Sequence, residues 1–458
     1  MLESAESTIS KTMVSQKEFF STGKTRDIKF RINQLRRLKA AIAKNQEVIK
    51  KALWKDLHKS PEESFLTEIS IVESEIDNHI KNLKKWSKPK RVPTPIFLQP
   101  SSSKLIYEPL GVVLVVAPWN YPFQLLINPL VGAISAGCCC ILKPSPDAPA
   151  IAKVMEELIN SLFDSNYISL FQGGRETNTI LFSTPFDLIF FTGSSKVGKV
   201  VMKAAAENLT PVILELGGKS PCIVDADANI DLAAKRITWG KLINAGQTCI
   251  APDYLFAHQS IKDELLNKIA KNIELMYGKE IKNSRFYPRI ITDQAFERLT
   301  DLLDQGTIHT GGDTDPTEKF IAPTIIDNVK PEFKVMQGEI FGPILPVLTF
   351  NHIEEAISSI NEGEKPLAFY YFGSNAKAKK VLSKTSSGGA CVNDTLLHIV
   401  NHHLPFGGVG HSGIGKYHGY HSFLAFSNQR SVVTSSTWID LSLKYVPFKH
   451  FNILKKFI

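Results

Sequence analysis

The chain has 458 residues, more than a single hydrophobic core normally supports, so we expect at least two domains. Its 43% apolar and 21% charged residues, with 28 glycines and 25 prolines, are close to globular averages and exclude a wholly disordered or collagen-like protein. The net charge of +8 suits an anionic small molecule and is too small for a nucleic-acid-binding protein, so we expect no nucleic-acid partner.

Two further absences concern cellular location. No apolar run approaches the length of a membrane-spanning helix, and the first fourteen residues lack the apolar core of a signal peptide. The sequence also shows no C-x-x-C pair and no cysteine with a histidine at metal-ligand spacing, which predicts neither disulfides nor a metal site. Free thiols are typical of a reducing compartment, so we expect a cytoplasmic protein.

The N-terminal part is predicted to be helical. Apolar residues recur with a period of 3.6 over 28–57, and a second helical stretch covers 62–86. The basic stretch 81–91 is either a solvated helix end or a polyanion site. Prolines then interrupt any helix, so 87–110 is predicted to be extended.

From residue 111 the pattern changes to strands alternating with helices, which is typical of an α/β protein with a parallel sheet. The predicted strands are 111–116, 138–142, 187–191 and 211–216, and the predicted helices are 125–136, 151–162 and 196–207. Cys138, Cys139 and Cys140 lie in one of these strands and are expected to pack as small apolar side chains. A second α/β section covers about 231–390.

The closing segment has two parts. A glycine-rich stretch, 405–419, follows the second α/β section, and residues 444–458 mix aromatic and aliphatic side chains with lysine. This last part is predicted either to pack on a partner subunit or to lie on a membrane surface.

Four features could carry chemistry. The strand 187–191 enters a glycine-bearing turn, 192–198, that precedes a helix and suits a pyrophosphate, although an ordinary turn remains an alternative. Glu215 ends a buried strand, where desolvation raises a carboxyl pKa towards that of a useful base. Cys249 follows a flexible turn and is a candidate nucleophile, or a core residue. Asn120 lies between two prolines at a strand end, from which its amide could donate to an oxyanion.

Seven segments together resemble the signature blocks of NAD(P)-dependent aldehyde dehydrogenases in order and spacing. They are PWNYP at 118–122, LKPS at 142–145, FTGS at 191–194, LELGGKSP at 214–221, NAGQTC at 244–249, EIFGP at 339–343 and PFGG at 405–408. The chain length, the short N-terminus and KYHG at 416–419 resemble the class 3 branch, which acts on fatty, aromatic and medium-chain aldehydes.

The resemblance implies a role for each matching residue. Cys249 would attack the aldehyde, Asn120 with the Cys249 backbone N–H would hold the oxyanion, and Glu215 would activate the water that hydrolyses the thioester. The implied contacts of NAD or NADP are Trp119, Lys143, Ser145, Gly193, Ser194, Ser195, Lys196, Val197, Gly198, Glu339 and Phe341. Tyr121 and Phe423 resemble substrate-tunnel positions, and no metal is implied.

The resemblance also implies a fold and two alternatives. A Rossmann-like cofactor domain would comprise 1–86 and 109–213, a catalytic domain 214–394, a bridging β arm 87–108 and 395–430, and a tail 431–458. The arm would pair across a homodimer, which satisfies its exposed strand edges. An acylating enzyme that uses coenzyme A, or an inactive binding relative, remains an alternative, and Glu215 favours water.

One position departs from the family pattern. Many relatives carry a glutamate after the serine of LKPS, whereas Pro146 stands here. Pro146 can neither accept from the ribose hydroxyls of NAD nor repel the 2′-phosphate of NADP. The sequence therefore predicts that NADP is accepted alongside NAD.

Overall fold

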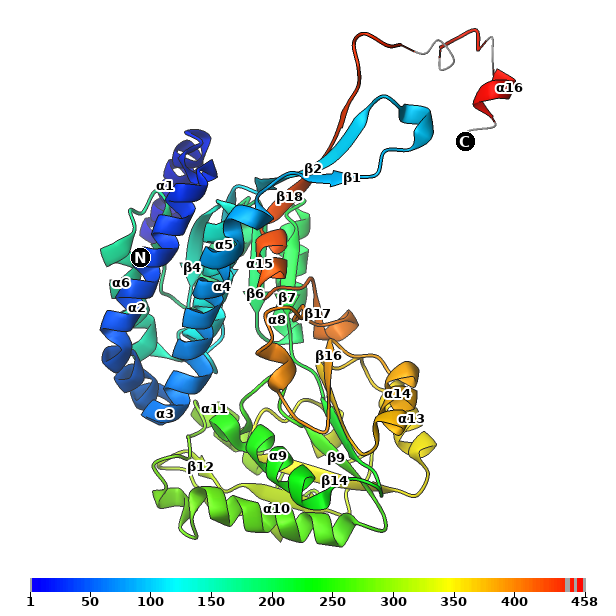
Figure 1. Cartoon of the computed structure of the whole chain (residues 1–458). Coiled ribbons are helices and arrows are strands. Elements are labelled where there is room, and N and C mark those ends of the chain that lie inside the picture. The colour runs from blue at the N-terminus through cyan, green and yellow to red at the C-terminus, as the bar shows by residue number, and fades with distance from the viewer. Residues whose placement is uncertain (1, 441–444, 449–450, 456–458) are drawn as a thin grey trace.

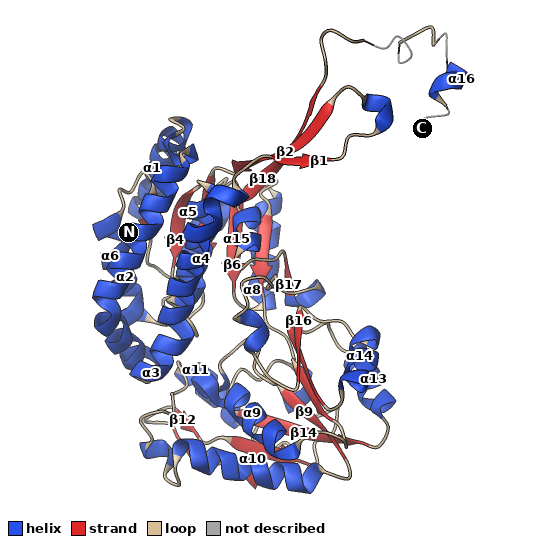
Figure 2. Cartoon of the chain, viewed as in Figure 1, coloured by secondary structure: helices blue, strands red, loops and turns tan. Residues whose placement is uncertain are grey.

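The computed structural model describes residues 2–440, 445–448 and 451–455. The predicted tail segment is therefore described only in part, because residue 444 and residues 449–450 and 456–458 lie outside the described residues. Figures 1 and 2 show two sheets flanked by helices and an arm that projects from the body. Within the described residues, no helix combines the length and apolar composition needed to cross a membrane.

The first sheet has six strands, and all but one run parallel. Their order is β17 (Gly413–Ile414), β7 (Val212–Glu215), β6 (Leu188–Thr192), β3 (Val112–Val116), β4 (Cys139–Lys143) and β5 (Ile168–Leu170). The central strands are buried continuous apolar runs, as expected for a parallel sheet covered on both faces. The three adjacent cysteines are fully buried and free. The predicted α/β fold and the predicted strands of this part are confirmed.

Helices surround the first sheet. They are α1 (Leu2–Ser21), α2 (Ile28–Leu57), α3 (Pro61–Ser64), a π-helical turn η2 (Phe65–Ile69), α4 (Ser70–Trp86), α5 (Gln124–Ala136), α6 (Pro149–Leu162), α7 (Arg175–Ser183), α8 (Ser195–Ala206) and α15 (Tyr420–Ala425). Helix α2 buries the apolar stripe predicted for it, and Asp27 caps its first turn by accepting from the Lys29 N–H. Helix α5 is buried along its whole length and packs against α2 and α4.

The second sheet has seven strands. Their order is β10 (Thr307–Thr310), β13 (Thr324–Asp327), β14 (Ile344–Phe350), β9 (Tyr254–His258), β8 (Pro221–Val224), β15 (Ala368–Phe372) and β16 (Gly389–Val392). Only the edge strand β10 is antiparallel. Its helices are α9 (Ile230–Leu242), α10 (Lys262–Tyr277), α11 (Asp293–Thr300), α12 (Lys334–Gln337), α13 (Ile353–Glu362) and α14 (Asn375–Lys384), and a small hairpin joins β11 (Thr314–Asp315) to β12 (Phe320–Ile321).

The arm is an antiparallel sheet of β1 (Lys90–Val92), β2 (Ser102–Pro109) and β18 (Ser427–Thr434) (Figure 1). It differs from the prediction because residues 395–426 do not join it. Phe406, Tyr417 and Phe426 of this range are at most 5% exposed and pack in a core, and β17 instead extends the first sheet. Beyond β18 the chain continues outward to a short helix, α16 (Phe451–Leu454). The domain boundaries remain a prediction.

A buried ion pair joins the segment between α2 and α4 to the loop after β3. Lys59 and Glu68 are both fully buried, with 2.6 Å between Nζ and Oε1. Glu68 Oε2 accepts from the backbone N–H groups of Phe123 and Gln124 at 2.9 and 3.2 Å. Lys59 also donates to the Asn120 carbonyl at 3.1 Å. Two charges and three backbone groups thus satisfy one another without solvent.

We expect Glu68→Gln to destabilise the protein strongly. The amide preserves shape but leaves the Lys59 ammonium buried without a counter-charge, which typically costs about 3–5 kcal/mol. The midpoint of urea-induced unfolding should therefore fall well below that of the wild type. Asp77→Asn is the matched control, because the Lys39–Asp77 pair lies at the surface and such pairs contribute little. Equal midpoints for the two variants would contradict this account.

Candidate active site

A cavity of about 800 Å³ lies at the carboxyl ends of the first sheet's strands. Lys143 ends β4, Thr192 ends β6, Glu215 ends β7, and Asn120 follows β3. This edge is where open parallel sheets bind ligands. The predicted site residues that line the cavity are Trp119, Asn120, Lys143, Ser145, Gly193, Ser194, Lys196, Val197, Glu215, Cys249, Glu339 and Phe341. Residues spread over more than two hundred positions are thus brought to one place.

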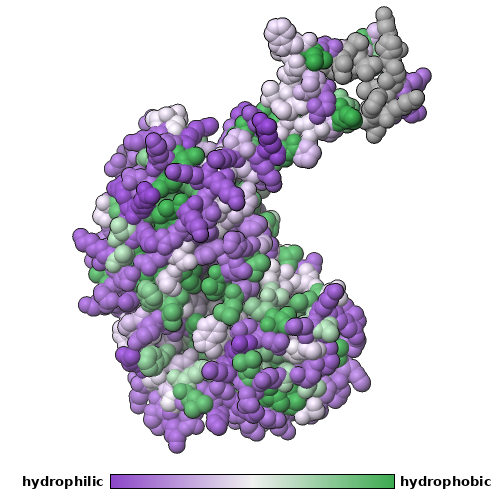
Figure 3. Space-filling model, in the orientation of Figure 1, coloured by the Kyte–Doolittle hydropathy of each residue, from purple (hydrophilic) through white to green (hydrophobic). Residues whose placement is uncertain are grey.

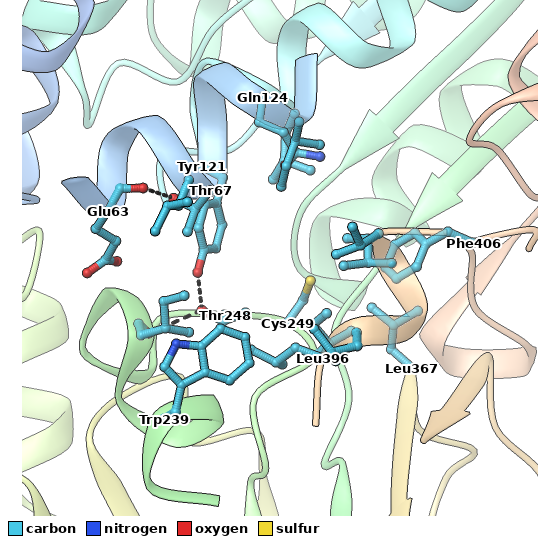
Figure 4. A pocket seen from close by; sticks show the side chains of 18 of the residues that line it. Glu63, Thr67, Tyr121, Gln124, Trp239, Thr248, Cys249, Leu367, Leu396 and Phe406 are labelled. Carbon is cyan, nitrogen blue, oxygen red and sulfur yellow. Dashed lines mark hydrogen bonds between the residues drawn. The ribbon is translucent and has the colours of Figure 1, made fainter. Parts of the chain in front are cut away.

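A second cavity, of about 480 Å³, lies on the other side of Cys249. Its lining is mostly apolar and includes Tyr121, Leu396 and Phe406 (Figure 4). Glu215 and Cys249 line both cavities, together with Leu125 and Thr192. The thiol and the carboxyl therefore stand where the two cavities meet.

The turn before Cys249 has an unusual backbone. Asn244, Ala245 and Gly246 are consecutive residues in the left-handed region, with φ of 52°, 52° and 74°. At Gly246 a Cβ would lie 2.2 Å from the Gly342 carbonyl oxygen, so only glycine fits. Glu63 helps to hold this turn, because its Oε1 accepts from the Asn244 backbone N–H at 2.8 Å.

The buried side chain of Gln247 holds the same turn through hydrogen bonds to backbone groups. It is fully buried, and its amide nitrogen donates to the carbonyls of Asn244 and Arg289 at 3.0 Å each. Its amide oxygen accepts from the Ile291 N–H at 3.1 Å. The Asn120 amide donates to the Gln247 carbonyl at 3.0 Å and keeps its second N–H. The predicted oxyanion donor is therefore fixed to the loop that carries the thiol.

The residue before Cys249, Thr248, is held by a hydrogen bond to Tyr121. The hydroxyl groups of Thr248 and Tyr121 are 2.7 Å apart, as the dashed line in Figure 4 shows. The Lys59 ammonium lies 4.3 Å from the centre of the Tyr121 ring and holds that ring in turn. Desolvation, with smaller contributions from Glu339 and Glu215, raises the pKa of the Cys249 thiol well above its ordinary value. The resting thiol is therefore protonated at neutral pH.

Glu215 is almost entirely removed from water, with 2% of its surface exposed. Neither of its carboxyl oxygens has a hydrogen-bond partner among the described residues. Strand β17 pairs with β7 so that Gly413 lies opposite Glu215, which brings the segment after Phe406 over the carboxyl group. Burial raises the pKa of Glu215 well above its ordinary value, and the nearby Lys416 opposes this effect. The group has the properties of a poised base.

Glu339 faces the cavity of about 800 Å³ from the loop between α12 and β14. Desolvation and then Asp253 raise its pKa to about 8. Its Oε1 has no partner among the described residues, which leaves an acceptor free for a ligand. At Gly217 a Cβ would lie 1.9 Å from Glu339 Oε2, so this glycine makes room for the carboxyl. Phe341, with φ of 52°, packs its ring 5.4 Å from that of Trp119.

The far end of the same cavity is formed by the segment after β4. Lys143 is 1% exposed and donates to the Pro144 carbonyl at 2.7 Å. Burial lowers its pKa to about 8, and Asp147 partly offsets this. The Ser145 hydroxyl donates to the Asp147 carboxyl at 3.3 Å and accepts from the Asp147 N–H at 3.2 Å. Pro146 lines the cavity beside them.

The turn into α8 divides its predicted contacts into two groups. Gly193, Ser194, Lys196 and Val197 line the cavity, and the Ser194 hydroxyl caps the helix by accepting from Val197. Ser195 instead donates to the His411 carbonyl at 3.1 Å. Gly198 is buried, and a Cβ there would lie 2.8 Å from Leu216. Ser195 and Gly198 therefore support the turn and do not line the cavity.

The structure does not bring Phe423 to either cavity. It is 1% exposed, and its ring packs against those of Trp86, Tyr107 and Tyr420. The predicted tunnel contact of Phe423 is therefore not supported, because its position in the core leaves no face for a substrate. Tyr121 does line the apolar cavity, as predicted.

Sequence reasoning missed several residues that support the site. Lys59, Glu63 and Glu68 come from the helical N-terminal part and act on loops more than fifty residues away. Lys59 and Glu63 stand in the polar stretch 58–64, so nothing local in the sequence marks their roles. The backbone geometry of the turn likewise depends on the buried Gln247, and nothing local in the sequence marks this role.

Comparisons with known proteins agree with this geometry. A family model described as "Aldehyde dehydrogenase family" matches residues 2–432. The 4,4'-diaponeurosporen-aldehyde dehydrogenase of Staphylococcus aureus is 46% identical, covering 98% of this chain and 99% of that protein. The dimeric NADP-preferring aldehyde dehydrogenase of Rattus norvegicus is 46% identical over 94% of this chain and 95% of its own.

Solved structures give the same result. A substrate-bound aldehyde dehydrogenase (AldH) of Staphylococcus aureus superposes with a TM-score of 0.96 at 46% identity, covering 98% and 99% of the two chains. A betaine aldehyde dehydrogenase variant from the same organism, solved with NAD⁺, gives a TM-score of 0.84 at 27% identity over 95% and 90%. The chain therefore belongs to the aldehyde dehydrogenase family, among relatives of class 3, and is an aldehyde dehydrogenase.

Proposed function

We propose that this enzyme oxidises an apolar aldehyde to the carboxylic acid with NAD(P), through a thioester on Cys249 that water hydrolyses. The observation that carries the proposal is the meeting of two cavities at Cys249 and Glu215. An apolar chain can then approach the thiol from one side, and a dinucleotide from the other. The alternatives are an acylating enzyme and an inactive relative, and the buried, unpartnered Glu215 favours hydrolysis over both.

The residues act in sequence. The Cys249 thiol gives its proton to water as its sulfur bonds to the aldehyde carbon, and the Asn120 amide with the Cys249 N–H stabilises the oxyanion. When bound, NAD(P) would supply the acceptor for the hydride that leaves this carbon. The carbonyl then re-forms as a thioester on Cys249. Glu215 then takes a proton from a water molecule as that water attacks the thioester. The carbon–sulfur bond breaks, the thiol is reprotonated and the acid leaves.

The cofactor-side cavity has the features that a dinucleotide requires. Helix α8 begins at the cavity and presents a positive dipole end to a pyrophosphate. The free acceptor of Glu339 suits the ribose next to the nicotinamide, with Phe341 and Trp119 beside it. Lys143 and Ser145 suit the adenosine ribose. One relative is named NADP-preferring and another was solved with NAD⁺, and we propose that this chain accepts both.

The substrate is proposed to be a long apolar aldehyde. The mostly apolar lining of the second cavity suits a hydrocarbon chain. A relative with 46% identity is named for a carotenoid aldehyde, 4,4'-diaponeurosporenal. We further propose a cytoplasmic homodimer in which the arm of one copy adds its exposed strand edges to a neighbour. Peripheral membrane contact by the tail remains a prediction.

Cys249→Ser should abolish dehydrogenase turnover while the protein still binds NAD(P). A hydroxyl is a far weaker nucleophile than a thiolate, and no histidine precedes it in the turn to activate it. Formation of reduced cofactor measures turnover, and cofactor fluorescence measures binding. Cys391→Ser is the matched control, because Cys391 is also half-buried but contacts His398 outside both cavities. Substantial activity in the Cys249 variant would contradict the assignment.

Glu215→Gln should slow hydrolysis more than acylation, so a burst of reduced cofactor should precede slow turnover. Because burial raises the pKa of Glu215, the wild-type carboxyl is protonated at low pH and becomes a base only as pH rises. Steady-state turnover of the wild type should therefore increase with pH, and this hydrolytic increase should be lost in the glutamine variant. Stopped-flow traces across pH test both effects. If the glutamine variant turns over at the wild-type rate without a burst, Glu215 is excluded as the base of the hydrolytic step. Transfer of the acyl group to coenzyme A in place of hydrolysis would favour the acylating alternative.

Pro146→Glu should shift cofactor preference towards NAD. The new carboxylate would lie at the cavity end that Lys143 and Ser145 share, where it accepts from ribose hydroxyls and repels a 2′-phosphate. Losing a charge-assisted contact of this kind should lower kcat/KM for NADP by about tenfold or more. The comparison of kcat/KM for both cofactors in wild type and variant measures the effect. A wild type already restricted to NAD, and unchanged by the substitution, would show that Asp147 or another group sets the preference.

A further inference from the structure

Lys219 and Asp253 form a largely buried ion pair that lines neither cavity. Charged side chains normally face water, and Figure 3 shows hydrophilic groups over much of the visible surface of this protein. The side chains of Lys219 and Asp253 are instead only 18% and 5% exposed, with 2.5 Å between Nζ and Oδ2. The position of such a pair is informative because charges removed from water require precisely placed partners.

The Lys219 ammonium uses its remaining two protons on one segment of backbone. It donates to the carbonyls of Val335 and Gly338 at 2.8 and 3.1 Å. Together with the Asp253 carboxylate, these acceptors satisfy all three protons of the ammonium. Gly338 is the residue directly before Glu339, so Lys219 holds the loop between α12 and β14 from its N-terminal side.

Asp253 and Arg298 hold the other side of the same loop. The second carboxylate oxygen of Asp253 accepts from the Ile340 N–H at 2.9 Å, and Arg298 donates to the Ile340 carbonyl at 2.7 Å. Ile340 lies between Glu339 and Phe341, which both line the cavity of about 800 Å³. Charged side chains therefore bind backbone groups on both sides of Glu339 and fix the direction in which its carboxyl group enters the cavity.

The two members of the pair come from the segments that carry the base and the nucleophile. Lys219 follows Glu215 by four residues, and Asp253 follows Cys249 by four residues. These segments are joined without the ion pair, because the Asp253 N–H donates to the Ser220 carbonyl at 2.8 Å and β8 pairs with β9. The charged side chains add only the connection to the loop between α12 and β14. Loss of the pair should therefore release that loop and leave the thiol and the base in place.

We propose that Lys219 and Asp253 are positioning residues for hydride transfer. Their pair holds Glu339 and Phe341 where these side chains orient the nicotinamide end of NAD(P) beside Cys249. The inference rests on the proposed function and extends it. A misplacement of about 1 Å can cost about a hundredfold in rate, so hydride transfer should depend strongly on the pair. Formation and hydrolysis of a thioester need no cofactor and should not.

The first test measures the dehydrogenase reaction of Lys219→Met, which removes the charge and both backbone contacts. Its kcat/KM for NAD(P) should fall by about tenfold to a hundredfold. The deuterium isotope effect with an aldehyde deuterated at the carbonyl carbon should be larger than in the wild type. That carbon–hydrogen bond breaks only in hydride transfer, so the isotope effect reports which step has become slow.

The second test uses the enzyme without cofactor. Hydrolysis of p-nitrophenyl acetate should stay close to the wild-type rate in Lys219→Met, because the Cys249 sulfur displaces nitrophenolate and water then hydrolyses the acetyl thioester without any hydride step. Amide hydrogen exchange of the segment 335–343 should become faster, because the backbone contacts that protect it are lost.

Lys262→Met is the matched control. Lys262 and Asp327 form a pair of the same kind, 2.6 Å apart with side chains 13% and 16% exposed, which joins α10 to β13. This variant should leave all four measurements unchanged. Lys219→Arg keeps a cation and should retain more dehydrogenase activity than Lys219→Met. Asp253→Asn breaks the same pair from its other side while preserving shape, and it should show the same selective loss.

The opposite outcomes are equally defined. Ester hydrolysis that falls in proportion to dehydrogenase activity would show that the pair supports the fold in general, which would overturn the proposal. An unchanged isotope effect, unchanged hydrogen exchange or an equal loss in Lys262→Met would overturn it as well. A wild type that forms no reduced cofactor with any aldehyde would instead overturn the proposed function, so the two failures are distinguishable.

Discussion

Lys59 and Glu68 form an ion pair in which both side chains are removed from water. This pair holds the loop after β3, which carries Asn120 and Tyr121 into the site. The Glu68 carboxylate accepts two backbone N–H groups at the start of α5, and the Lys59 ammonium donates to the Asn120 carbonyl. The same ammonium lies over the Tyr121 ring. Asn120 and Tyr121 in turn contact the turn that carries Cys249. A buried pair with all its partners present therefore fixes geometry, whatever its net contribution to stability.

Desolvation is the second constraint, and it acts on every titratable group at the centre of the site. Burial raises the pKa of Cys249 and Glu215 and raises that of Glu339 to about 8. Burial thus disfavours the charged form of each of these three groups. Charge develops only when the thiol or the carboxyl gives up its proton, in a place where oriented donors such as the Asn120 amide are already fixed.

The two cavities are lined mainly by different segments of the molecule. Strand ends of the first sheet, with the N-terminus of α8, form much of the first cavity, whereas η2, α9 and the segment 396–406 form much of the second, apolar one. Strand β17 joins these parts, because it places the glycine-rich segment against Glu215.

Local periodicity and contiguous motifs in the sequence were sufficient to predict most of the strands and helices of the first α/β section. The buried strands β3, β4, β6 and β7 and the helices α2, α5, α6 and α8 follow from apolar runs and from the 3.6-residue period, and they were predicted within two residues. Cys249, Glu215 and Asn120 were predicted as site residues because each follows a turn or strand end of a parallel sheet, whose carboxyl ends meet at one edge, and because each stands in a segment that resembles the family's signature blocks.

Only the tertiary structure decided which distant residues complete the site. Glu63 and Gln247 act through hydrogen bonds to backbone groups in other segments, and no spacing in the sequence encodes such partners. Phe423 shows the converse, since its aromatic side chain suited a substrate tunnel by resemblance but is enclosed by other rings. Residues 395–426 were predicted to belong to the arm but pack against the body. The burial of their aromatic side chains depends on which surfaces meet in three dimensions, and the sequence does not show this.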